Sequence, residues 1–153
     1  MVDLMTISTV FAPLLGVELL IVALIDFKRH KIPNFWLLTA LVTKICWLGS
    51  LFFFEREKFG EYFAQSVTGF VFLLVMAVLL YKPFYKTVGA GDFKLLMTFG
   101  FCVGFPSCLA VMVISLFLAV LVLILSKFGK LDKNYRIPFA PVVFLAYLIR
   151  LLF

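Results

Sequence analysis

The stretch LAVMVISLFLAVLVLIL, Leu109–Leu125, decides the fold class because it contains no charged residue, no glycine and no proline. A helix needs about 20 mainly apolar residues to cross the hydrocarbon core of a bilayer, and this run approaches that length. The whole chain is 65% hydrophobic and 14% charged, with a mean hydropathy of +1.17, which is more apolar than a soluble domain of 153 residues. The sequence therefore predicts a membrane protein.

Outward from this run, the chain divides into six apolar segments that are candidate transmembrane helices. They are Leu4–Ile25, Phe35–Phe54, Tyr62–Leu80, Phe93–Val103, Ser107–Leu125 and Ile137–Phe153. The residues Gly104-Phe105-Pro106 predict a tight turn, and Pro138 and Pro141 fall in the first turn of the last segment, where a missing N–H is tolerated. No linker or internal repeat divides the sequence. We expect an all-α polytopic membrane bundle of about six segments, with residues 1–153 in a single domain.

The basic residues predict the orientation of this bundle. Ten of the 14 Lys and Arg residues fall in loops 27–34, 81–94 and 126–136, whereas loop 55–61 mixes two basic residues with three acidic ones. Lys and Arg near the ends of membrane spans favour the cytoplasmic side. We therefore expect the three basic loops, 27–34, 81–94 and 126–136, in the cytoplasm and both termini outside. The basic clusters form no stripe with interleaved aromatic residues, so we expect no nucleic-acid partner. No basic region precedes the first segment, which is therefore expected to stay in the mature protein.

The metal-binding residue types do not form a pattern that predicts a metal or redox site. Cys46, Cys102 and Cys108 lie in apolar surroundings and form no CxxC pair, so we expect buried thiols. His30 is the single histidine and lies in a basic loop without a carboxylate cluster, which favours a solvated or interfacial residue over a ligand. We therefore expect neither a metal nor a cofactor.

Two aspartates fall at the predicted cytoplasmic rim, where charged groups beside apolar spans call for a functional explanation. Asp26 ends the first segment, and Asp92 begins a later one in the sequence Gly89-Ala90-Gly91-Asp92. Two carboxylates that share a site cannot both ionise cheaply, so one holds a proton and acts as an acid while the other activates a water as a base. This pattern is typical of an aspartic peptidase.

The surroundings of the two aspartates refine this hypothesis. Gly89 and Gly91 can adopt positive φ and let the backbone approach a substrate closely, although glycines and an aspartate also begin ordinary helices with an Asp N-cap. If Asp92 lies at a helix N-terminus and Asp26 at a helix C-terminus, the helix dipoles favour a negative charge on Asp92. We then expect Asp26 to hold the shared proton.

Three further charged residues need an explanation. Glu18 and Lys44 reach a similar depth if the first two segments form an antiparallel hairpin. They are expected either to form an ion pair, or to stay apart with Lys44 reaching toward the interface and Glu18 protonated. Lys94 follows Asp92 by two positions and is either a cytoplasmic anchor or a group that tunes the aspartates electrostatically.

Three sequence signatures together resemble those of the type IV prepilin peptidase family of GxGD aspartic peptidases. They are Asp26 followed by Lys31-Ile32-Pro33-Asn34, then Gly89-Ala90-Gly91-Asp92-Phe93-Lys94-Leu95-Leu96, then Ile137-Pro138-Phe139-Ala140-Pro141. The resemblance implies that Asp26 and Asp92 are catalytic, in a multi-pass protein of the cell (inner) membrane. It also implies that the substrate is a membrane-anchored prepilin whose leader is removed on the cytoplasmic side. Ala140 stands where many relatives have glycine.

The chain lacks the cytoplasmic region with paired CxxC motifs of the longer, bifunctional members. It is therefore similar to the short peptidase-only form of tight-adherence (Flp-type) pili, which implies neither zinc nor S-adenosylmethionine. GxGD proteases of the presenilin type share the second motif but do not follow their first aspartate with an Ile-Pro-Asn segment. Two alternatives remain: a small proton-coupled transporter, which would favour inverted repeats and acids at the midplane, and a non-catalytic pilus or secretion assembly factor.

Overall fold

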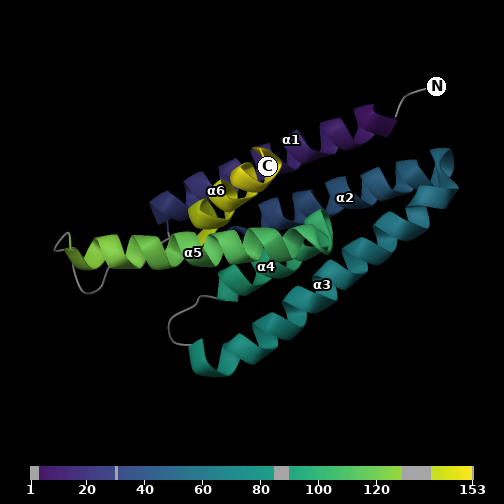
Figure 1. The fold of residues 1–153 in the computed structure, drawn as a ribbon. Coiled ribbons are helices and arrows are strands. Elements are labelled where there is room, and N and C mark those ends of the chain that lie inside the picture. Colours follow the sequence, from purple (N-terminus) through teal and green to yellow (C-terminus); the bar gives the residue numbers. More distant parts are fainter. Residues whose placement is uncertain (1–3, 30, 85–89, 129–138, 153) are drawn as a thin grey trace.

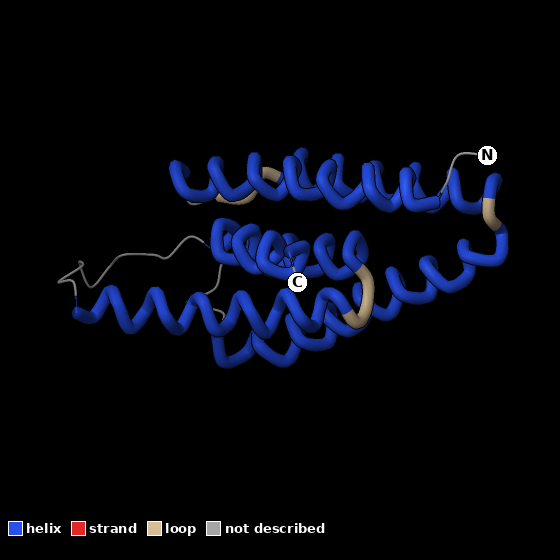
Figure 2. Tube along the Cα trace, turned by 45° about the horizontal axis from the view of Figure 1, so that its top comes forward, coloured by secondary structure: helices blue, strands red, loops and turns tan. Residues whose placement is uncertain are grey.

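The computed structural model describes residues 4–29, 31–84, 90–128 and 139–152, and these residues form helices joined by short connections (Figures 1 and 2). The helices are α1 (Leu4–Arg29), α2 (Asn34–Phe54), α3 (Arg56–Phe84), α4 (Ala90–Val103), α5 (Ser107–Phe128) and α6 (Phe139–Leu152). No strand occurs in these ranges. The all-α prediction is confirmed for this part of the chain.

The short helix α4 lies at the centre of the bundle, in contact with α2, α3, α5 and α6, whereas α6 lies between α1 and α5. Figure 1 shows α1 and α2 as neighbouring helices, with α3 running diagonally downward from the end of α2 and past α4. Apolar side chains from all six helices pack into one core. Its most buried members include Leu15, Val22, Leu37, Leu73, Leu95, Phe99, Cys102, Val111, Val143 and Ala146.

Several helices extend beyond the apolar segments that were predicted from the sequence. Helix α1 continues to Arg29 rather than Ile25, so Asp26 lies inside its last turn. The loop expected at 55–61 is wrong, because α3 already begins at Arg56 and only Glu55 separates it from α2. The Glu55 carbonyl accepts the N–H groups of Lys58 and Phe59, each at 3.1 Å, which starts α3 at once. The predicted apolar segments end where charged residues begin. The helices continue past these points, because Lys, Arg and Glu also favour the helical conformation.

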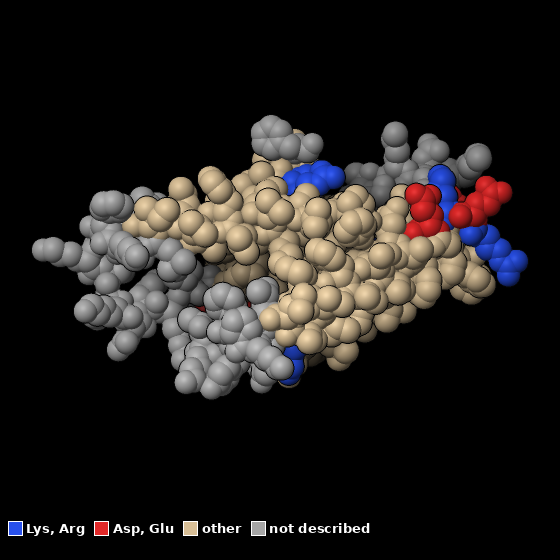
Figure 3. Space-filling model, turned by 60° about the horizontal axis from the view of Figure 1, so that its bottom comes forward, with Lys and Arg blue, Asp and Glu red and all other residues tan. Residues whose placement is uncertain are grey.

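Two of the described helices have the length and hydropathy of membrane spans, namely Asn34–Phe54 and the Arg56–Leu79 part of α3. Shorter apolar helices run over Ser107–Val122 and Phe139–Leu152. Large apolar side chains such as Phe53, Leu79 and Phe117 point outward, as lipid contact allows. On the face drawn in Figure 3, acidic and basic side chains gather near the α2–α3 junction, and most of the remaining described surface carries no charged side chain. These features support a membrane protein, while the number of six spans stays a prediction.

Helices α3 and α4 touch backbone to backbone at a pair of glycines. A Cβ atom on Gly100 would lie 2.6 Å from the Gly69 carbonyl oxygen and 2.9 Å from Leu73 Cδ1, and a Cβ atom on Gly69 would overlap the Gly100 carbonyl oxygen. Small residues permit this close approach of helices in membranes. The contact fixes α4 against α3 near its C-terminal end.

The predicted tight turn at Gly104-Phe105-Pro106 is confirmed and holds the same end of α4. Gly104 has a φ of +75°, and its N–H donates to the Gly100 carbonyl at 2.9 Å, an arrangement that commonly ends helices. The next N–H, of Phe105, donates to the Gln65 carbonyl of α3 at 2.9 Å. The turn is thus bonded to α3 as well as to α4.

Substitution of Gly100 by alanine tests the glycine contact. Because the new methyl group has no room, we expect Gly100→Ala to destabilise the protein by about 1–3 kcal/mol, measured by thermal unfolding in detergent. The matched control is Gly49→Ala in α2, where an added Cβ meets nothing within 4 Å and alanine should be neutral or stabilising by roughly 0.5–1 kcal/mol. Equal unfolding temperatures for the two variants would contradict the predicted contact.

Candidate active site

Asp26 lies buried in the last turn of α1 and is bonded to a helix that is distant in sequence. Its side chain is 5% exposed, and its Oδ2 atom accepts a hydrogen bond from the Ala140 N–H at 3.1 Å. Ala140 is the second residue of α6, and N–H groups in a first helical turn have no acceptor within their own helix. The Asp26 carboxyl therefore caps α6, which joins the first signature to the third.

The second signature meets the first through the connection between α1 and α2. An added Cβ on Gly91 would lie 3.3 Å from Ile32 Cβ, so the Gly91 backbone packs directly against the Ile32 side chain. Three residues further along α4, Lys94 Nζ donates a hydrogen bond to Asn34 Oδ1 at 3.3 Å. These contacts hold the N-terminal end of α4 against the start of α2.

Both aspartates consequently lie at one end of the bundle, called here the aspartate end, where α1 ends and α4 and α6 begin. Asp92 is partly buried in the first turn of α4, directly after the glycine that touches Ile32. The opposite end, with the α4–α5 turn, is called the turn end. Asp26 lies near the C-terminus of α1 and Asp92 near the N-terminus of α4, as the hypothesis of unequal proton sharing assumed.

The structure adds a feature that the dipole argument lacked. The N-terminus of α6 also faces Asp26, and its positive dipole end opposes the effect of the α1 C-terminus. Because Oδ2 accepts the Ala140 N–H, a proton held by Asp26 would sit on Oδ1. The unequal sharing of the proton stays a prediction, now with α6 as a further influence.

Gly91 of the GxGD motif acts differently from what the sequence predicted. Gly91 lies within α4, and Gly104 is the only glycine with positive φ in the described ranges. The missing side chain of Gly91 makes room for Ile32 instead of permitting an unusual backbone conformation. Gly89 and His30 lie outside the residues that the structure describes, so their predicted roles stay predictions.

Glu18 and Lys44 do not form the expected ion pair. Glu18 Oε1 accepts a hydrogen bond from Thr43 Oγ1 at 2.9 Å, one position before Lys44. The Lys44 ammonium lies instead 4.3 Å from the Trp47 ring centroid and 5.0 Å from that of Phe11. The only salt bridge between residues of the described ranges joins Lys58 to Glu55 at 3.4 Å. The alternative, in which Lys44 reaches toward the interface, stays a prediction: the side chain is 4% exposed and lines a cavity between the helices.

The structure also gives the positions of the three cysteines and of Lys94. Cys102 and Cys108 are buried as expected, but Cys46 is exposed, because it lies on the outward face of α2. Lys94 is exposed and its one assigned contact is to Asn34, which ties α4 to α2, so a tuning effect on the aspartates stays a prediction. In the part of the chain that the structure describes, no three His, Cys, Asp or Glu side chains gather as a metal site would require.

Sequence reasoning missed the backbone N–H of Ala140 and the packing role of Ile32. A backbone donor carries no side-chain signal, and Ala140 was noted only as a departure from glycine in the third signature. Ile32 was part of a signature, but its partner Gly91 is 59 positions away in the sequence. Only the folded chain brings them together.

A family model described as the type IV leader peptidase family matches residues 14–124. This range contains both aspartates and the Ile32–Asn34 segment, while α6 lies beyond it. Searches of curated proteins and of solved structures gave no significant match. The bond between Asp26 and α6 is therefore information that the family match does not contain.

A pair of substitutions at Asp26 separates its structural role from its chemistry. Asp26→Asn keeps an acceptor for the Ala140 N–H, whereas Asp26→Leu removes it and leaves a buried donor unpaired. We expect the Leu variant to be less stable than the Asn variant by about 1–3 kcal/mol, measured by thermal unfolding in detergent. Equal stability of the two variants would show that the bond to α6 contributes nothing measurable.

Proposed function

Because the chain belongs to the type IV leader peptidase family, we propose that it is a membrane aspartic endopeptidase that removes leader peptides from type IV prepilin-like precursors. Asp26 and Asp92 are the proposed catalytic residues. The observation that carries the proposal is their common location, since Asp26 bonds to the start of α6 while the residue before Asp92 packs on Ile32, six positions after Asp26. Three segments distant in sequence thereby converge on one end of the bundle.

The proposed reaction uses the two carboxyl groups in opposite protonation states. One carboxylate takes a proton from a water molecule while the water oxygen attacks the scissile carbonyl carbon, and the partner carboxyl protonates the carbonyl oxygen. The tetrahedral intermediate then collapses as its C–N bond breaks. The first carboxyl returns its proton to the leaving nitrogen, and a hydroxyl proton of the intermediate returns to the second carboxylate. The pair is regenerated, with Asp92 as the first base and Asp26 as the first acid.

Charge supports a cytoplasmic location for the aspartate end. Exposed basic side chains of Lys28, Arg29, Lys31 and Lys94 surround it. Near the α2–α3 junction at the other end, Arg56 and Lys58 are mixed with three acidic residues. Under the positive-inside rule this difference favours cleavage at the cytoplasmic face and both termini outside. The apolar helix of a membrane-anchored prepilin would lie in the same bilayer, beside the outward-facing apolar side chains of the bundle.

Co-expression with a candidate prepilin tests the proposal. Leader removal is read by a gel shift and confirmed by N-terminal sequencing of the product. We expect Asp26→Asn and Asp92→Asn each to slow processing by about 10²–10⁴-fold, because each removes one member of the acid–base pair.

The matched control is Glu57→Gln, which removes an exposed carboxylate near the α2–α3 junction, far from the aspartate end. It should process at the wild-type rate. Normal processing by both aspartate variants would exclude the mechanism. A wild-type chain that leaves every tested prepilin intact, yet is needed for pilus assembly, would favour a non-catalytic assembly factor.

A further inference from the structure

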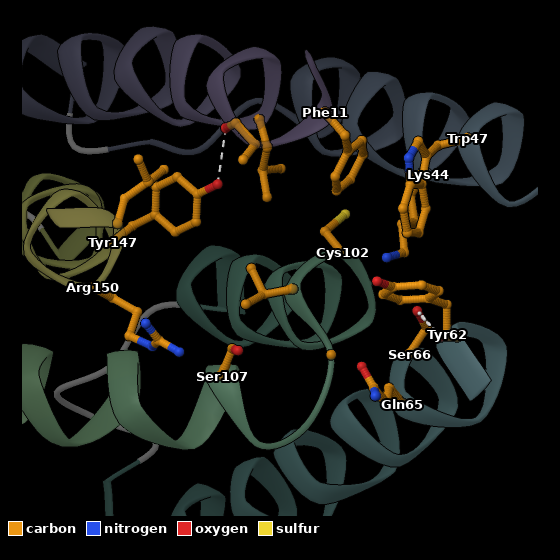
Figure 4. A pocket seen from close by; sticks show the side chains of 15 residues that line it. Phe11, Lys44, Trp47, Tyr62, Gln65, Ser66, Cys102, Ser107, Tyr147 and Arg150 are labelled. Carbon is orange, nitrogen blue, oxygen red and sulfur yellow. Dashed lines mark hydrogen bonds between the residues drawn. The ribbon is translucent and has the colours of Figure 1, made fainter. Parts of the chain in front are cut away.

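A cavity of about 380 Å³ lies at the turn end of the bundle, remote from the aspartates. It lies at the C-terminal end of α4, which has 14 residues, whereas α2 and α3 have 21 and 29. At about 1.5 Å per residue, α4 spans roughly 21 Å and α2 roughly 31 Å. Because α4 begins at the aspartate end, it stops before the turn end of α2 and leaves a space beside it. Figure 4 shows the residues that line it.

The charges that line this cavity have one sign. Lys44 enters from α2 and Arg150 from α6, on opposite sides in Figure 4, and the described residues that line the cavity include no Asp or Glu. Lys44 is nearly inaccessible, and no described carboxylate lies within salt-bridge distance of it. The rings of Trp47 and Phe11 offset only part of the free energy needed to bury an ammonium group. Among the described residues that line the cavity, no carboxylate therefore balances these two positive charges.

A second, independent observation points to a ligand with acceptor atoms. Trp47 lines the cavity, and its indole Nε1–H is buried without a hydrogen-bond partner. An indole nitrogen can only donate, and most buried donors have partners in folded proteins. Glu18 Oε2 is likewise buried without a partner, but Glu18 lines a neighbouring, smaller cavity that shares Leu15 and Cys102 with this one, and its Oε1 accepts a bond from Thr43. An anionic group with acceptor oxygens in the larger cavity would balance the Lys44 charge and accept from the Trp47 N–H.

We propose that this cavity binds the phosphate group of an anionic phospholipid. Lys44 and Arg150 would contact the phosphate oxygens, and the Trp47 Nε1–H would donate to one of them. The size lies in the range of about 300–1,000 Å³ that is typical of small-molecule sites. Arg150 is exposed and lies two residues before the end of α6, so the cavity reaches the surface at the level where the helix ends. Trp and Tyr side chains, here Trp47 and Tyr62, are typical of the membrane interface.

The proposal is tested by lipid binding to the purified full chain in detergent, measured by native mass spectrometry and by thermal unfolding. The added molecules are phosphatidylglycerol, phosphatidylcholine and inorganic phosphate at equal concentration. We expect phosphatidylglycerol to bind and to raise the unfolding temperature, and the other two to have little effect.

Lys44→Met should weaken phosphatidylglycerol binding about tenfold or more and should raise the unfolding temperature of the lipid-free protein, because a buried unpaired cation is removed. The matched control is Lys58→Met, an exposed cation near the α2–α3 junction, outside the cavity. It should bind the lipid as the wild type does. If Lys44→Met does not fold, the exposed residue Arg150 supplies a second variant, Arg150→Gln, with the same expected loss of binding.

Equal effects of the two phospholipids on the wild type would overturn the proposal, as would unchanged phosphatidylglycerol binding by the foldable cavity variants. Protection by inorganic phosphate that equals that of phosphatidylglycerol would assign the site to a soluble anion and overturn the lipid assignment. Asp26→Asn should bind the lipid normally, since the cavity shares no residue with the aspartate end. Failure of the peptidase proposal and failure of the lipid proposal are therefore distinguishable.

Discussion

The buried hydrogen bond from the Ala140 N–H to Asp26 Oδ2 is the constraint on which the arrangement of the aspartate end depends. It joins two helices whose bonded residues are 114 positions apart, and it satisfies a first-turn donor that α6 itself cannot pair. The same carboxyl group is the proposed catalytic acid. One oxygen of Asp26 thus orients a helix, and the other remains for chemistry, so the position of the acid is fixed by the packing of α1 against α6.

Asp92 is positioned by contacts at both ends of α4. At the turn end, Gly69 and Gly100 bring the backbones of α3 and α4 together, and at the aspartate end Gly91 packs against Ile32. Each contact depends on a missing side chain, and each limits movement of α4 along or away from its neighbours. Because α4 has only 14 residues and contacts four other helices, such limits at its two ends largely determine where its first turn lies.

Sequence patterns predicted the helical segments well because long apolar runs and the Gly104–Pro106 interruption are local properties. These patterns predicted how far along its helix each residue lies, but not the direction around the helix axis in which its side chain points. Lys44 was matched to Glu18 by depth, yet a step of one residue turns a side chain by about 100°, and Thr43 faces Glu18 instead. The predicted topology placed the two aspartates at the same rim, whereas the family resemblance singled out the three signatures. The atoms that join them, among them the Ala140 N–H, have no signal in the sequence.

The directions of α4 and α6 connect the two ends of the molecule. Both helices begin at the aspartate end, so their positive dipole ends face Asp26 and Asp92, where the proposed general base chemistry needs negative charge. Residues near their C-terminal ends line the cavity at the turn end, which therefore faces negative dipole ends. Arg150 lies in the last turn of α6 and offsets its negative end, and Lys44 adds a further positive charge that no described carboxylate lining the cavity balances. The proposed anion is therefore held by the two side-chain charges, Lys44 and Arg150, and not by the helix dipoles, which oppose it.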